Sequence, residues 1–128
     1  MGSVLAVGCG GFIGASLRYL CAEGISKLYT GQLPVATFAI NLLGSFFIGF
    51  LSQWLALFYP NHRMLRLFMT TGILGGFTTF STFSLETADL FQKGSAGIAC
   101  LNVAASAGCC VLGALAGRAF ANVTGGMR

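Results

Sequence analysis

Ten consecutive residues near the middle of the chain carry the groups best suited to hold small ions. The stretch from Gly75 to Ser84 reads Gly-Gly-Phe-Thr-Thr-Phe-Ser-Thr-Phe-Ser. A glycine pair before a Thr/Ser-rich run is poor helix material, so we expect a helix to break at this pair. A break frees backbone carbonyls, and those of Gly75 and Thr78 suit a small cation. Hydroxyls of the same stretch can donate to an anion; they belong to Thr79, Ser81, Thr82 and Ser84.

Two phenylalanines of this stretch, Phe80 and Phe83, are three residues apart and therefore share a helical face. The edge of an aromatic ring is electropositive, so rings that face inward would contact an anion without a fixed charge. The residues alone leave open the alternative that both rings pack against lipid or other helices.

Two further segments carry polar residues at intervals of four, which places each set on one face of a helix. A buried amide is costly unless it is hydrogen-bonded. Either the two stripes form hydrogen bonds with each other, or they line a water-filled path for a small ion. The residues alone leave both alternatives open. The stripes are Thr37, Asn41 and Ser45 in one segment, and Asn102, Ser106 and Cys110 in the other.

The elements that position these residues follow from composition. Of 128 residues, 55% are hydrophobic and only 8% are charged, against roughly 25% charged in soluble domains. Four uncharged runs are long enough to cross a bilayer. We therefore predict an all-α membrane protein with a single transmembrane domain and four transmembrane helices, the third broken at its midplane. The spans cover about residues 3–22, 33–58, 66–92 and 95–121.

The first uncharged run lacks the basic start of a signal peptide, so we interpret it as a retained span. Gly-x-x-x-Gly motifs at Gly10–Gly14 and Gly113–Gly117 predict close helix packing. The five cysteines show no metal-ligand spacing and no Cys-x-x-Cys pair. We expect them to serve as small packing residues. The scattered basic residues form no patch for nucleic acid.

Four spans place both termini on one side of the membrane. Basic residues divide four against three between the two sides, which is a feeble positive-inside bias. The chain therefore either inserts in one fixed orientation or inserts both ways to give an antiparallel pair. Transport would require an oligomer, most simply a dimer, because four small helices cannot easily enclose and seal a pathway. The two groups are Arg63, Arg66, Arg118 and Arg128 against Arg18, Lys27 and Lys93.

Residues Gly75 to Ser84 resemble the signature of the Fluc/CrcB fluoride-channel family. The segment Gly14–Tyr19, which contains Arg18, resembles the family's first-span arginine motif, and Thr37–Gly44 resembles its second-span segment. Glu86 follows the signature at the expected place. The resemblance covers essentially the whole chain.

The resemblance implies an antiparallel dual-topology homodimer with two fluoride pores in the bacterial plasma (inner) membrane. It implies a structural sodium ion at the dimer interface, held by the backbone carbonyls of Gly75 and Thr78 from both subunits. Asn102 and Cys110 depart from the family, which often has a larger ring and a hydroxyl there. Arg18 is expected to cap a helix end or pair across the dimer. The implied fluoride-pore residues are Phe80, Phe83, Asn41, Thr37, Thr79, Ser81, Asn102, Ser106, Cys110 and Glu86.

The expected function is a passive, highly selective fluoride channel that exports cytoplasmic fluoride and protects the cell; it is not an enzyme. Neutral hydrogen fluoride crosses the bilayer and ionises inside, and an inside-negative potential drives the anion out at about 2.3 kcal/mol per charge per 100 mV. One alternative is a small proton-coupled multidrug exporter, which would need a carboxylate in an early span. The acids Glu86 and Asp89 instead lie at the end of the third span. A second alternative is an assembly subunit without transport.

Overall fold

The computed structural model describes residues 1–126, and within them it contains helices and no strand. The predicted all-helical fold with four helical segments is thereby confirmed. Three segments are single helices, long and apolar enough to cross a membrane, whereas the third segment (residues 63–92) is divided into pieces. The elements are α1 (Gly2–Leu28), α2 (Val35–Phe58), α3 (Arg63–Arg66), η1 (Leu67–Leu74), α4 (Gly75–Phe77), α5 (Phe80–Gln92) and α6 (Ala96–Gly126).

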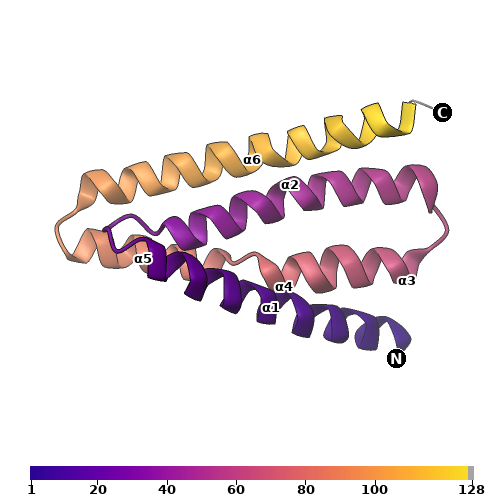
Figure 1. The fold of residues 1–128 in the computed structure, drawn as a ribbon, viewed down its shortest axis with the longest axis horizontal. Coiled ribbons are helices and arrows are strands. Elements are labelled where there is room, and N and C mark those ends of the chain that lie inside the picture. Colours follow the sequence, from indigo (N-terminus) through magenta and orange to yellow (C-terminus); the bar gives the residue numbers. More distant parts are fainter. Residues whose placement is uncertain (127–128) are drawn as a thin grey trace.

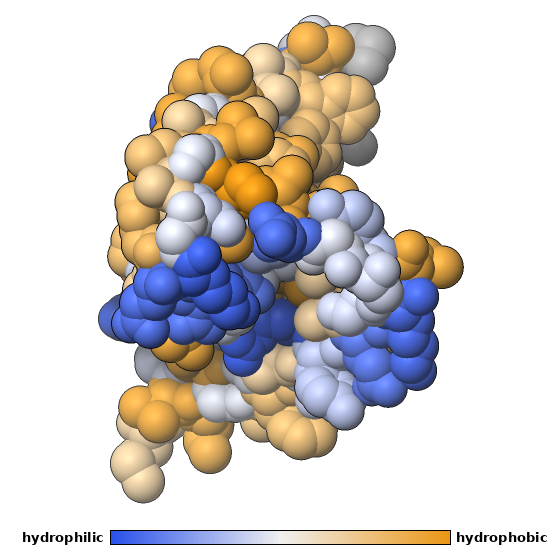
Figure 2. Space-filling model, turned by 90° about the vertical axis from the view of Figure 1, so that its left-hand side faces the viewer, coloured by the Kyte–Doolittle hydropathy of each residue, from blue (hydrophilic) through white to orange (hydrophobic). Residues whose placement is uncertain are grey.

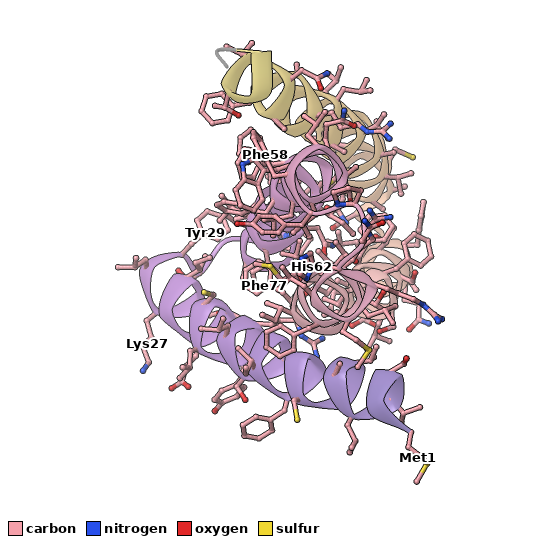
Figure 3. The ribbon with its side chains drawn as sticks, turned by 90° about the vertical axis from the view of Figure 1, so that its right-hand side faces the viewer. Met1, Lys27, Tyr29, Phe58, His62 and Phe77 are labelled. Atoms are coloured by element: carbon pink, nitrogen blue, oxygen red, sulfur yellow. The ribbon has the colours of Figure 1, made fainter. Side chains whose placement is uncertain are left out.

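The four segments lie side by side as an antiparallel bundle (Figure 1). Helix α6 packs on α2, and α1 packs on η1 and α4. Figure 3, viewed along the bundle, places α1 and α6 on opposite sides, with α2 and the third segment between them. The start of α1 and the end of α6 lie at the same end of the bundle, as expected for four passes.

Glycines allow the helices to approach closely at both of these interfaces. A Cβ atom at Gly14 would overlap the carbonyl oxygen of Ile73 in η1. A Cβ atom at Gly117 would overlap the carbonyl oxygen of Phe46 in α2. Each Gly-x-x-x-Gly motif therefore faces the backbone of a neighbouring helix, which confirms the close packing predicted for both.

The outer faces of the bundle are apolar. Large hydrophobic side chains such as Phe12 of α1 and Leu112 of α6 are exposed along its sides. Figure 2 looks at the end that carries the α1–α2 connection and the α5–α6 turn, where hydrophilic residues gather between apolar flanks. This distribution matches a bundle whose sides face hydrocarbon and whose ends face water.

The break in the third segment lies at Thr78 and Thr79, not at the glycine pair where it was expected. Thr78 has ψ 155° and Thr79 has φ −148°, both extended conformations. Gly75 and Gly76 instead remain helical in α4. They stay there because Gly76 packs against α1, where a Cβ atom would lie 2.7 Å from the carbonyl oxygen of Gly11.

Candidate functional site

The side-chain amide of Asn41 in α2 stabilises the break. Its Nδ2 donates to the carbonyl oxygen of Thr79 at 3.0 Å, and its Oδ1 accepts from the Thr79 backbone N–H at 2.8 Å. Thr79 is buried, so water cannot easily replace these bonds. Asn41 thus supplies the partners that a continuous helix would otherwise provide. Non-helical backbone inside a membrane requires hydrogen-bond partners of this kind.

The hydroxyl of Thr79 caps the N-terminus of α5. It accepts from the backbone N–H of Thr82 at 3.2 Å, the usual role of a Thr N-cap. It also lies 2.9 Å from the hydroxyl of Thr82 and 3.2 Å from that of Ser81. The two threonines and the serine therefore form a cluster of neutral hydroxyl groups at the positive end of a helix dipole.

Most of the predicted pore residues meet around one cavity of about 450 Å³, which no charged side chain lines. The rings of Phe80 and Phe83 have centroids 5.4 Å apart at an interplanar angle of 44°. Phe80 is 79% exposed in the single chain, so this side of the cavity is open. The polar and aromatic residues that line it are Asn41, Ser45, Thr78, Thr79, Phe80, Phe83, Ser106 and Cys110.

Thr37 and Glu86, also predicted for the pore, do not line this cavity but bond to each other. The Thr37 hydroxyl donates to Glu86 Oε1 at 2.9 Å. Glu86 Oε2 is buried and has no hydrogen-bond partner within residues 1–126. Ser81 also lies outside the lining, and its hydroxyl is hydrogen-bonded to the Thr79 hydroxyl.

A second hollow of about 290 Å³ contains Arg18 together with Thr37, Thr79 and Thr82. Thr79 lines both hollows, so the broken backbone lies between them. Within the described part of the chain, the salt bridge is between Lys27 and Glu23, and Arg18 takes part in none. Its expected capping or cross-dimer role therefore remains a prediction.

In the stripe on α6, Ser106 and Cys110 line the 450 Å³ cavity, whereas Asn102 does not. Asn102 is buried. Its Nδ2 donates to the hydroxyl of Thr87 at 2.9 Å, while its Oδ1 accepts from Ser106 at 3.4 Å. Within residues 1–126, Thr37 and Asn41 of α2 and Asn102 of α6 thus bond to the third segment, and no hydrogen bond joins the two stripes. Asn41, Ser45, Ser106 and Cys110 line the cavity, so their place along an ion path remains a prediction.

Thr87 was missed by sequence reasoning. Its hydroxyl donates to the carbonyl oxygen of Phe83, four residues earlier, at 2.7 Å. A hydroxyl one turn after Phe83 on the same helical face was the available signal. Its bond to Asn102 depends on how α5 and α6 pack, which the sequence pattern does not specify.

The backbone at the break fits the donor set expected for a sodium ion. Because the Thr79 N–H donates to Asn41, the carbonyl of Gly75 loses its usual i+4 partner. No other donor within residues 1–126 replaces it, and Gly75 is exposed on the surface of the chain. The Thr78 carbonyl belongs to a residue that is itself extended. Unwound carbonyls of this kind coordinate sodium in membrane proteins.

Comparison with known proteins identifies the family of the chain. The family model described as "CrcB-like protein, Camphor Resistance (CrcB)" matches residues 5–118. Three relatives bear the name fluoride-specific ion channel FluC. The protein of Ruminiclostridium cellulolyticum is 50% identical and covers 98% of this chain and 96% of its own. That of Clostridium novyi is 42% identical with 93% of both chains covered, and that of Roseobacter denitrificans is 49% identical with 91% and 93% covered. From its near-complete match to the family model and to these relatives, we conclude that the chain belongs to the CrcB-like family.

Proposed function

We propose that the chain is a passive, selective fluoride channel of the bacterial plasma membrane. The observation that carries the proposal is the uncharged cavity of about 450 Å³ lined by two phenylalanine rings and neutral donors. Relatives that match nearly the whole chain and are named as fluoride-specific ion channels support it. The channel spans the membrane several times, is not an enzyme, and lowers cytoplasmic fluoride, which protects the cell. Nothing in the relatives' names supports a drug exporter.

The cavity suits a small anion that must be held without being trapped. Asn41 carries a second N–H on Nδ2 beyond the one that bonds to Thr79, and this donor is available to an anion in the cavity. The ring edges of Phe80 and Phe83 add weakly positive contacts. Fluoride therefore exchanges its water for several weak partners, none of which carries a full opposite charge.

Three of the four remaining predicted pore residues, Thr37, Ser81 and Glu86, lie along an approach to the cavity. Thr37 lines the hollow that contains Arg18, and its hydroxyl holds Glu86. Ser81 belongs to the hydroxyl cluster at the start of α5. We assign these residues to an entrance that leads to Thr79, and the cavity residues to the interior of the path.

The functional unit is an antiparallel dual-topology homodimer. One chain leaves the cavity open on the side of the exposed Phe80 ring, and a second copy of the chain would close it. Two antiparallel copies bring both broken segments together and provide two pores. The nearly equal division of basic residues between the two ends gives neither orientation a strong preference, so the chain can insert both ways.

The same dimer would place a structural sodium ion at the interface between the two breaks. The carbonyl oxygens of Gly75 and Thr78 from both copies would hold it, and the ion would supply positive charge beside these carbonyl groups. The test replaces sodium by a larger organic cation after trapped sodium has been removed from the purified protein. Fluoride efflux is expected to fall with sodium and to return when it is restored; unchanged efflux contradicts the sodium site.

Fluoride efflux from liposomes tests the function itself. The purified chain is reconstituted with internal fluoride, and a fluoride electrode records release when an ionophore dissipates the opposing potential. We expect rapid release that does not depend on a proton gradient. An assembly subunit would give no release above empty liposomes. A proton-coupled exporter would instead accumulate a cationic dye when a pH gradient is imposed.

A further inference from the structure

A chain of hydrogen bonds connects the cavity to two buried residues behind it. Ser106 Oγ donates to Asn102 Oδ1, Asn102 Nδ2 donates to Thr87 Oγ1, and Thr87 Oγ1 donates to the carbonyl oxygen of Phe83. Ser106, Asn102 and Thr87 are each 7% exposed or less. Ser106 and Phe83 line the cavity, whereas Asn102 and Thr87 do not. We name this set of four residues the hydroxyl relay.

The direction of the hydroxyl relay is fixed by counting protons. A carbonyl oxygen only accepts, so the single hydroxyl proton of Thr87 is committed to Phe83. Thr87 Oγ1 can then only accept from Asn102, and the amide must turn its NH₂ group toward Thr87. The amide oxygen therefore faces Ser106, which donates its own proton to it. As a result, the Ser106 proton points away from the cavity.

The bond at the cavity end is the weakest of the three. Ser106 Oγ lies 3.4 Å from Asn102 Oδ1, beyond the usual 2.5–3.0 Å for hydroxyl donors. The other two bonds, at 2.9 and 2.7 Å, have ordinary lengths. The hydroxyl relay therefore opens most easily at Ser106, beside the space where an anion would sit.

We infer that Thr87 and Asn102 are positioning residues that control the proton of Ser106. In the empty cavity Asn102 holds this proton, and an entering fluoride competes for it. When fluoride leaves, the bond between Ser106 and Asn102 re-forms, so the competition weakens fluoride binding and favours release. The inference rests on the proposed function, because it names residues that set fluoride affinity at the same cavity.

The test measures fluoride efflux from liposomes over a range of fluoride concentrations, which gives the half-saturating concentration. Thr87→Val keeps the side-chain shape but removes the acceptor that orients Asn102. The amide is then free to turn its NH₂ group toward Ser106, and the Ser106 proton turns into the cavity. One additional hydrogen bond to fluoride is expected to lower the half-saturating concentration about two- to tenfold. Thr87→Ser keeps the hydroxyl and is expected to retain the wild-type value.

A second variant, Asn102→Leu, breaks the hydroxyl relay at the next bond and is expected to shift the concentration in the same direction. If Thr87→Val does not assemble, the half-saturating fluoride concentration of Asn102→Leu tests the inference in its place. In a Ser106→Ala background neither change is expected to have a further effect, because no proton remains to be released. Thr70→Val removes a comparable local bond, from the Thr70 hydroxyl to the Arg66 carbonyl at 2.7 Å, and serves as the control with wild-type affinity.

Two results overturn the inference while leaving the proposed function intact. The first is an unchanged half-saturating concentration in both Thr87→Val and Asn102→Leu. The second is a shift of equal size in the Ser106→Ala background, which would assign the effect to packing. Absence of fluoride efflux from the wild-type chain would instead overturn the proposed function, and the inference with it.

Discussion

Replacement of Asn41 by leucine is expected to destabilise the break more than any other single loss of a polar side chain in α2. Asn41 bonds to both the N–H and the carbonyl of Thr79, at 2.8 and 3.0 Å. Leucine has the same branching and the same number of side-chain heavy atoms but would leave both backbone groups without partners. A buried unsatisfied group costs about 1–3 kcal/mol, so the two together cost about 2–6 kcal/mol.

The protein can reduce this cost in one way, by closing the break. The Thr79 N–H would then return to the Gly75 carbonyl, which is its i−4 partner in a continuous helix. That rearrangement would consume a proposed sodium ligand. Asn41→Leu is therefore expected to lose sodium-dependent efflux as well as stability.

Two measurements examine this reasoning. Denaturant unfolding in detergent micelles gives the loss of stability, and hydrogen exchange of a peptide that contains Thr79 reports the state of the break. The matched control is Asn122→Leu, which removes an exposed interhelical bond from Gln53 to Asn122 at 2.9 Å and should cost about 1 kcal/mol or less. Equal stability losses in Asn41→Leu and Asn122→Leu, with unchanged exchange at Thr79, would refute the role given to Asn41.

Three further predictions concern the rings, the packing and the topology. Phe80→Ile combined with Phe83→Ile should abolish fluoride efflux without loss of assembly, because isoleucine is apolar but has no positive ring edge; efflux at the wild-type rate would exclude the rings. Gly14→Ala should prevent the close approach of α1 to η1 and reduce stability. The control Gly24→Ala lies at a glycine that faces open space, so it should be neutral or stabilise the protein by up to about 1 kcal/mol. Equal effects of the two changes on thermal unfolding would argue against this interface. Lys27→Cys, in a chain whose native cysteines are replaced by alanine, should react with an impermeant label from both sides of the membrane; labelling from one side alone would rule out antiparallel insertion.

The helical architecture was predictable because it depends on hydropathy and glycine spacing. Uncharged runs of sufficient length indicate the helices whatever their neighbours are. The motifs at Gly10–Gly14 and Gly113–Gly117 indicate close contact, because small residues are the ones that allow it. The structure confirms both, and α1 and α6 use these glycines against different partners.

The position of the break was not predictable from local propensity. Gly75 and Gly76 are the poorest helix formers of the stretch, yet they remain helical because Gly76 is needed against α1. The break falls at Thr79 because an amide from α2 reaches it. Thirty-eight residues separate Asn41 from Thr79, and only the packed bundle brings them together. The π-helix η1 has no local sequence signal that we can identify.

The site itself was predicted in part. Six of the ten expected pore residues line one cavity, because the signature stretch and the two stripes converge there. Asn102 was expected in the pore for its place in a stripe, but its neighbour Thr87 draws it behind the cavity. Residue spacing defines a helical face, whereas the partner that the face meets depends on tertiary packing.

The most direct test of passive, selective fluoride conduction is the reversal potential of the current in a planar bilayer. Under a tenfold fluoride gradient with equal chloride on both sides, a channel that passes only fluoride reverses at about 59 mV. This value should not change when a pH gradient is added. A reversal potential near zero would contradict selectivity, and a shift with the pH gradient would contradict passive conduction.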